Sequence, residues 1–186
     1  MSDSANSVAE VIRSRRTICD FELQIPPEET VRKAIELATW APNHKQTEPW
    51  RFAILGPKTV AQIVELNTKL VREQQGDKAA EAKRDRWRKI PGWIAASYRR
   101  SGDPLRDKEN YAAVCCAIQN LLLALWDERI GTKWSTGPIT RTEELDELLG
   151  IDAETEQIVG LIWYGFPATI PKSHRKPVEE VLRKLP

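Results

Sequence analysis

Arginines and a hydroxyl gather at the end of the first expected helix. Residues 7–16 carry apolar side chains at helical spacing, and the segment ends with Arg13, Arg15, Arg16 and Thr17. A planar guanidinium can donate to two oxygens at once, and a hydroxyl can bind a third. The segment therefore favours a phosphate clamp. The helix dipole also favours cations at this end, which accounts for one or two of the arginines without any ligand.

A second stretch that could bind a ligand is the polar loop between Pro42 and Pro49. Proline cannot continue a helix and favours extended backbone before it, so a helix ends at Pro42 and a strand follows Pro49. The six residues between them all carry hydrogen-bonding side chains: Asn43, His44, Lys45, Gln46, Thr47 and Glu48. Such a loop suits contact with a polar, planar ligand, and the alternative is an ordinary helix-to-strand connection.

Composition excludes several other kinds of site. Two histidines and three scattered cysteines form no metal-ligand cluster, and no glycine-rich phosphate fingerprint is present. The net charge of +1 gives no general argument for binding nucleic acid or an anionic membrane. The cysteines predict no disulfide framework, which favours a reducing compartment. Because Met1–Asn6 lacks the apolar core of a signal peptide, we expect a cytoplasmic protein.

The elements that must position these residues fit one domain of 186 residues. Apolar periodicity and proline or glycine boundaries predict helices and two strands. The expected helices cover residues 7–16, 28–40, 58–72, 107–131, 142–149 and 178–184, and the expected strands cover residues 50–55 and 156–164.

The helix of residues 107–131 has an unusual composition. From Tyr111 to Trp126 only Gln119 and Asn120 are not apolar, so the helix calls for burial on every side. Such a helix lies at the centre of a domain or between two subunits. A membrane span is not expected, because the apolar run is short of about 20 residues and two amides interrupt it.

Basic residues are concentrated in the segment of residues 72–106. The segment holds ten basic and five acidic residues, with Trp87 and Trp93 among them. We interpret it as a solvated, partly helical excursion or flap. Two alternatives are a nucleic-acid surface with stacking aromatics and a set of cations that attracts an anionic dinucleotide.

Taken together, four blocks of sequence resemble the FMN-dependent nitroreductase family, in particular its small bacterial single-domain members. Only the basic segment lies outside the blocks. The first two blocks are Arg15-Arg16-Thr17 and the loop from Ala41 to Trp50. The third is the apolar helix with Gln119-Asn120-Leu121, which leads to Trp134-Ser135-Thr136-Gly137. The fourth runs from Val159-Gly160 through Gly165-Phe166-Pro167 to Arg175.

The resemblance implies an α+β fold, a mixed β-sheet wrapped by helices, in an intertwined homodimer whose subunits swap extensions and share each flavin. It implies FMN as cofactor and NAD(P)H as co-substrate. The resemblance further implies that the FMN phosphate is held by Arg15, Arg16, Thr17 and Arg175. It implies that His44 and Gln46 contact the flavin and the ribityl chain. It also implies that a second polar loop faces the flavin, with the residues Trp134, Ser135, Thr136 and Gly137.

Two positions depart from the family pattern. Many members carry Lys or Arg two residues after the clamp hydroxyl, beside the flavin N1 and O2 edge, and this chain has Cys19 there. His44 and Lys45 are the candidates to replace that cation. Glu48 stands where glutamine is common, which adds an acid near the site.

The sequence thus predicts an FMN-dependent NAD(P)H oxidoreductase that passes hydride through the flavin N5 to a nitroaromatic, a quinone or a similar acceptor. We expect positioning residues and no dedicated acid, base or nucleophile, because the flavin carries the chemistry. A flavin-binding storage or sensing protein is the first alternative, and a nucleic-acid binder acting through residues 72–106 is the second.

Overall fold

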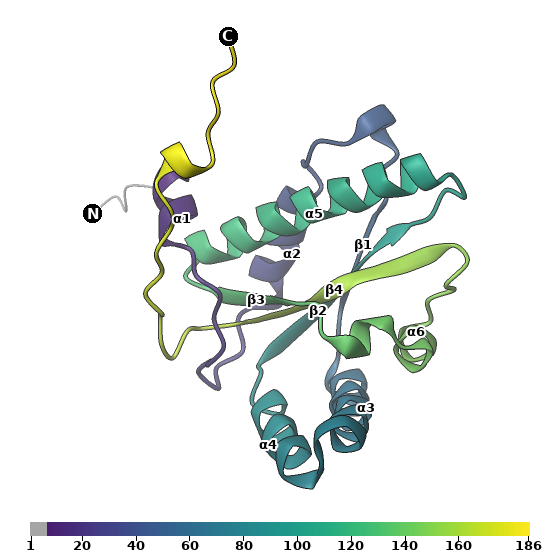
Figure 1. Cartoon of the computed structure of the whole chain (residues 1–186). Helices are drawn as coiled ribbons and strands as arrows, with labels where there is room; N and C mark the ends of the chain where they lie inside the picture. Colours follow the sequence, from purple (N-terminus) through teal and green to yellow (C-terminus); the bar gives the residue numbers. More distant parts are fainter. Residues whose placement is uncertain (1–6) are drawn as a thin grey trace.

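A four-stranded sheet runs through the middle of the molecule (Figure 1). The computed structural model describes residues 7–186, so the expectation for Met1–Asn6 lies outside the described residues. The strands lie in the order β1-β2-β4-β3. Their bounds are β1 Trp50–Ile54, β2 Gly92–Arg99, β3 Gly131–Ser135 and β4 Glu156–Gly165.

The α+β class is confirmed, but the expectation of a mixed sheet is wrong for these strands. All three pairs of neighbouring strands are antiparallel. Within residues 7–186 parallel pairing is confined to an isolated bridge between Thr17 and Thr132. Apolar patterns in the sequence locate a strand but do not determine whether its neighbour runs parallel or antiparallel to it. The sequence therefore could not predict that all these strands are antiparallel.

Helices cover both faces of the sheet (Figure 1). Helices α2 and α5 pack on one face, while α3, α4 and α6 pack on the other, and α1 lies against the C-terminal end of α5. The bounds are α1 Val8–Ser14, α2 Glu28–Ala38, α3 Pro57–Gln75, α4 Asp77–Trp87, α5 Pro104–Asp127 and α6 Glu143–Leu149, with 3-10 turns η1 His44–Gln46, η2 Pro138–Arg141 and η3 Val178–Glu180.

The basic segment of residues 72–106 is not a peripheral excursion. Its first part is helical as expected, since it contains α4, but its second part is β2, an interior strand with seven of eight residues buried. Trp87 and Trp93 are 3% and 1% exposed, so neither ring can stack on a base. Because charges were counted over all 35 residues of the segment, the apolar run after Pro91, which is long enough for a strand, was overlooked.

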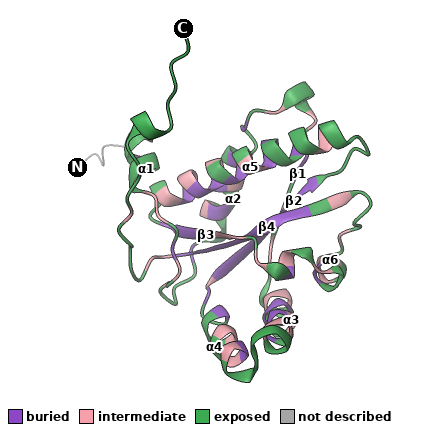
Figure 2. Ribbon diagram, viewed as in Figure 1, coloured by how far each residue is buried: buried purple, intermediate pink, exposed green. Residues whose placement is uncertain are grey.

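Helix α5 is buried on one face only. Its buried side includes Val114, Ile118 and Leu121, whereas Ala112 and Cys116 on the opposite side are exposed in the single chain, as the mixed colours of this helix in Figure 2 show. The structure therefore leaves an apolar helix face uncovered. Across residues 7–186, no helix combines the length and hydropathy that a membrane span requires.

The C-terminal tail extends away from the body of the molecule (Figure 1). The expected helix of residues 178–184 is wrong, because only the turn η3 forms there. Val178, Val181 and Leu182 are 57–75% exposed. Since a short helix is stable mainly when its apolar face packs, these exposed side chains explain why the helix is absent in the single chain.

Candidate functional site

Helix α1 brings the first arginines to the end of α5. The helix begins at a capping box in which the Ser7 side chain accepts from the Glu10 amide and Glu10 accepts from the Ser7 amide. It ends at Ser14, and the amide of the next residue, Arg15, donates to the Val11 carbonyl. Trp126 on α5 donates its indole N–H to Ser14 Oγ at 2.9 Å. This bond places the α1 terminus at the C-terminal end of α5.

Three arginines of the predicted clamp come together without a carboxylate. The pKa of Arg15 is lowered, first by burial and then by the positive charges of Arg175 and Arg16. Arg16 donates to the Arg13 and Arg15 carbonyls, and Arg175 donates to Ser173 Oγ and the His174 carbonyl. No ion pair involves these three side chains within residues 7–186. Repulsion of this kind is relieved by a bound anion.

The polar loop is fixed to α5 by side-chain hydrogen bonds. The Glu48 amide donates to Asn43 Oδ1 at 2.7 Å, and Asn43 Nδ2 donates to Thr47 Oγ1 at 3.1 Å. The Thr47 hydroxyl donates to Oδ1 of buried Asn110 at 3.1 Å, and Asn110 Nδ2 donates to the Arg99 carbonyl at 3.1 Å. The loop is therefore anchored on the N-terminal half of α5 and on the end of β2.

The backbone of this loop adopts conformations that cost energy. Lys45, Gln46 and Glu48 have φ angles of 57°, 49° and 44°, in the left-handed region that non-glycine residues rarely occupy. Strained backbone persists where surrounding contacts hold it, and it is concentrated at ligand sites. His44 and Gln46, which the family resemblance assigns to the flavin, are exposed at the surface of the loop.

The second polar loop follows β3. The Trp134 side chain packs against the α5-side core, and its indole N–H donates to the Val159 carbonyl at 3.4 Å. A Cβ at Gly160 would lie 2.3 Å from Trp134 Nε1, so a glycine is required where the ring crosses β4. Trp134 is half-buried against this core, whereas Thr136 is exposed at the end of the strand.

Within one chain, the arginines and the polar loop lie at opposite ends of α5. Ser14 contacts Trp126 near the end of this helix, and Thr47 contacts Asn110 near its start. Sixteen residues of helix separate the two anchors, which is about 24 Å along the axis. Figure 1 shows the same separation, with α1 and the tail at one end of α5 and the segment around residue 45 at the other. One chain thus assembles Arg15, Arg16 and Arg175 but does not bring His44 and Gln46 to them.

A second group of cations was missed from the sequence. Lys83 on α4 and Lys133 on β3 place their Nζ atoms 5.8 Å and 4.6 Å from the ring centroids of Trp87 and Trp163. The pKa of Lys83 is lowered, mainly by burial and then by Arg86 and Lys133. Fifty residues separate the two lysines in the chain, so neither spacing nor local charge could have paired them.

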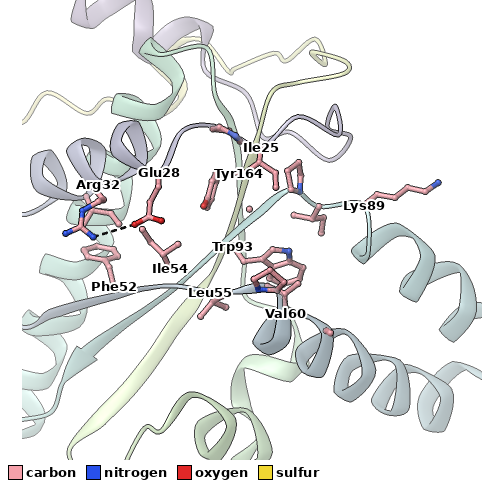
Figure 3. A pocket seen from close by; sticks show the side chains of 18 of the residues that line it. Ile25, Glu28, Arg32, Phe52, Ile54, Leu55, Val60, Lys89, Trp93 and Tyr164 are labelled. Carbon is pink, nitrogen blue, oxygen red and sulfur yellow. Dashed lines mark ion pairs between the residues drawn. The ribbon is translucent and has the colours of Figure 1, made fainter.

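A large groove lies on a different part of the molecule. It has a volume of about 1360 Å³ and runs between α2 and α3 (Figure 3). Phe52 and Ile54 of β1, with Trp93 and Tyr164, form its apolar floor, and Glu28 pairs with Arg32 at its rim. None of the residues that the sequence assigns to the flavin lines this groove.

Comparison with known proteins identifies the family. The model of the "Nitroreductase family" matches residues 12–166, which is most of the chain. The chain belongs to the nitroreductase family. Membership confirms the predicted class of enzyme, an NAD(P)H-dependent flavin oxidoreductase.

Individual nitroreductases are similar to the chain over nearly its whole length. The Bacillus subtilis (strain 168) protein named "Putative NAD(P)H nitroreductase YfhC" is 27% identical over 176 residues, covering 92% of this chain and 90% of that protein. A nitroreductase-like family protein from Bacillus cereus superposes with a TM-score of 0.87 at 27% identity, covering 100% and 99% of the two chains. A nitroreductase from Desulfovibrio desulfuricans, solved in complex with FMN, gives 0.78 at 25% identity, covering 98% and 99%.

Proposed function

We propose that this nitroreductase is a homodimeric, FMN-dependent NAD(P)H oxidoreductase that reduces nitroaromatics, quinones or similar conjugated acceptors. In this proposal each FMN lies between two protomers. Arg15, Arg16, Thr17 and Arg175 of one protomer hold the phosphate, and the polar loop of the partner, with His44 and Gln46, covers the flavin. Each protomer is one domain, and a cytoplasmic location remains part of the proposal.

The observation that carries the proposal is the arginine cluster without a carboxylate. Burial and then the charges of Arg175 and Arg16 lower the pKa of Arg15, so the folded chain holds positive charge that its own described residues do not neutralise. A phosphate dianion fits such a site, since guanidinium forks match its oxygens and charge-assisted bonds are strong. The FMN bound by the Desulfovibrio desulfuricans nitroreductase carries such a phosphate.

The distribution of the site along α5 supports two protomers. Because the loop and the arginines of one chain are held about 24 Å apart, a second chain is needed to bring a loop to each arginine cluster. The uncovered face of α5 at Ala112 and Cys116 offers an apolar surface for that chain. The exposed tail supplies further apolar side chains, and the groove beside the free edge of β1 gives the partner's tail a place to pack.

The side chains act by binding and orientation. Bound FMN supplies the acceptor and donor of hydride. The arginines fix the phosphate end, the turn of residues 135–137 offers backbone N–H groups, and the strained loop of residues 43–48 excludes water from the other side. No group of three or more metal-binding side chains occurs in residues 7–186.

Stopped-flow spectroscopy of the FMN-loaded protein tests the function. The protein should bind FMN, and anaerobic NADH or NADPH should bleach the flavin absorbance, after which a quinone or nitroaromatic should restore it. A protein that binds no FMN after reconstitution would contradict the cofactor assignment. Bound flavin that neither nicotinamide reduces would instead support the storage or sensing alternative.

A further inference from the structure

Strand β4 continues beyond the end of β3 and leaves a free edge (Figure 1). The last pair of these two strands is Ser135 with Leu161, so residues 156–160 have no strand beside them on this side within residues 7–186. The register of β4 against β2 also shifts in this region, between Ala96 and Ser97. Such irregularities are common next to binding sites, because they redirect side chains and end regular pairing. The edge therefore offers groups that a ligand can contact.

A pocket of about 500 Å³ lies along this edge. Its volume is within the range of small-molecule sites in proteins. Its walls come from the first residues of β4, from α5, from α6 and from the turn between β3 and α6. Thr136, in the second polar loop, is part of the wall. The pocket therefore adjoins the loop that the proposed function assigns to the flavin.

Carboxylates and guanidiniums line this pocket without pairing with one another. The acids are Asp146 of α6 and Glu156 of β4, and the arginines are Arg100 after β2 and Arg141 of η2. None of the four takes part in an ion pair within residues 7–186. The pKa of Asp146 is raised, first by burial and then by the charges of Glu143 and Glu156. Unpaired charges of both signs around one pocket favour a ligand that carries both.

Buried hydroxyls hold the β4 side of the pocket in place. Ser97, which is 4% exposed, donates its hydroxyl to Glu156 Oε1. Tyr98, which is 6% exposed, donates its hydroxyl to Gln157 Oε1 at 2.7 Å. The ring of Tyr111 packs edge-on against Tyr98, with 6.1 Å between the centroids, and lines the pocket. The pocket thus combines fixed polar groups with an aromatic wall on which an aromatic ligand can pack.

We propose that this pocket binds the electron acceptor, and that the acceptor is an aromatic zwitterion of the amino-acid type. The inference rests on the proposed function, since it requires the flavin to lie beside Thr136. Asp146 and Glu156 bind the ammonium group of the acceptor. Arg100 and Arg141 bind its carboxylate, because a guanidinium fork matches two carboxylate oxygens. The ring of the acceptor packs on the aromatic wall and extends toward the flavin.

Four nitroaromatics that differ in the charges of their side chains test the inference. The FMN-loaded natural protein should reduce 4-nitrophenylalanine with a kcat/KM at least about tenfold above those for 4-nitrophenethylamine, 4-nitrophenylpropionate and 4-nitrotoluene. Asp146→Asn should lower the ratio of kcat/KM for the amine to that for 4-nitrotoluene. Arg141→Gln should lower the corresponding ratio for the propionate. Glu147→Gln changes an exposed acid of α6 that does not line the pocket, and it should alter neither ratio.

A charge-conserving variant separates charge from shape. Asp146→Glu keeps the carboxylate and should restore the ratio for the amine. If the natural protein reduces 4-nitrophenylalanine and 4-nitrotoluene with equal kcat/KM, or if Asp146→Asn and Arg141→Gln keep the natural ratios, the inference is wrong while the proposed function stands. If FMN binds but none of the four compounds is reduced, the proposed function is wrong and the inference falls with it.

Discussion

Arginines in two regions of the molecule have opposite surroundings. Three arginines on or next to α3 and α4 are paired: Arg72 lies 2.7 Å from Asp77 and 2.8 Å from Glu81, Arg84 also pairs with Glu81, and Arg88 lies 2.7 Å from Glu65. At α1 and the tail, the charges of Arg16 and Arg175 act on Arg15, and Arg16 and Arg175 donate to backbone carbonyls or a hydroxyl.

The presence or absence of a carboxylate partner distinguishes surface arginines from arginines of a binding site. Exposed pairs contribute little to stability and require no ligand, because each charge already has a partner. A cluster of like charges raises the free energy of the folded chain and is neutralised only by something outside it. Charge count alone does not distinguish residues 72–106 from the predicted clamp, whereas the absence of ion pairs at Arg15, Arg16 and Arg175 within residues 7–186 supports the clamp.

The largest effect on FMN binding is expected from a substitution that prevents two protomers from pairing. Cys116→Arg places a charge on the uncovered face of α5, so it should prevent dimerisation and remove FMN binding at the same time. Light scattering should give 21.2 kDa in place of twice that mass. Ala82→Arg, at an exposed position of α4, is the control and should keep both properties. A monomeric Cys116→Arg protein that still binds FMN fully would contradict the shared site.

The next effect concerns the unpaired arginines directly. Arg15→Ala should weaken FMN binding by about 1.5–3 kcal/mol, the range for a charge-assisted hydrogen bond, and should leave riboflavin binding nearly unchanged. Isothermal titration with each flavin measures both. Arg88→Ala removes an arginine that has its own carboxylate and should not alter FMN affinity. Equal losses for FMN and riboflavin would show that Arg15 is structural.

A smaller effect is expected in the polar loop. Asn43→Ala removes the acceptor of the Glu48 amide and the donor to Thr47, which should cost about 1 kcal/mol of unfolding free energy and slow flavin reduction. Asn43→Asp keeps the acceptor and should recover most of the stability. Denaturant unfolding and stopped-flow reduction measure the two effects. An unchanged reduction rate in Asn43→Ala would mean that loop geometry does not matter to hydride transfer.

The smallest effect belongs to a paired arginine. Arg88→Ala should lower the unfolding free energy by about 0.2–1 kcal/mol, as expected for an exposed ion pair. The loss should shrink as salt is added, since exposed charges are screened. Urea unfolding at low and high ionic strength checks this. A loss of several kcal/mol of unfolding free energy that does not change with salt would contradict this, because it would mean that the ion pairs around α3 and α4 contribute strongly to stability.

Parts of the fold followed from local chemistry. Strands β1 and β4 were predicted because apolar runs there are bounded by proline or glycine, and α2 was predicted from its periodicity. Strand β2 was overlooked because its apolar residues are flanked by the basic residues of α4 and by Arg99 and Arg100. The tail failed as a helix because its stability depends on packing that a single chain does not provide.

The candidate site was only partly predictable for the same reason. Arg15 and Arg16 are adjacent in the chain, so their shared role was visible in the sequence, whereas the approach of Arg175 needed the family resemblance. The Lys83 and Lys133 pair depends on the sheet and on two tryptophan rings, which no local pattern encodes. The separation of the loop from the arginines likewise depends on the length of α5.

A mixed dimer tests the shared site most directly. One protomer carries Arg15→Ala and Arg175→Ala, the other carries His44→Ala and Gln46→Ala, and differently tagged chains are purified together. If each site takes arginines from one chain and the loop from its partner, one of the two sites is fully natural. The mixed dimer should then bind about one FMN per two chains with natural affinity and reduce it at the natural rate. Bound flavin that is reduced only at the slow rate of the loop variant would contradict the account, because it would mean that each site lies within a single chain.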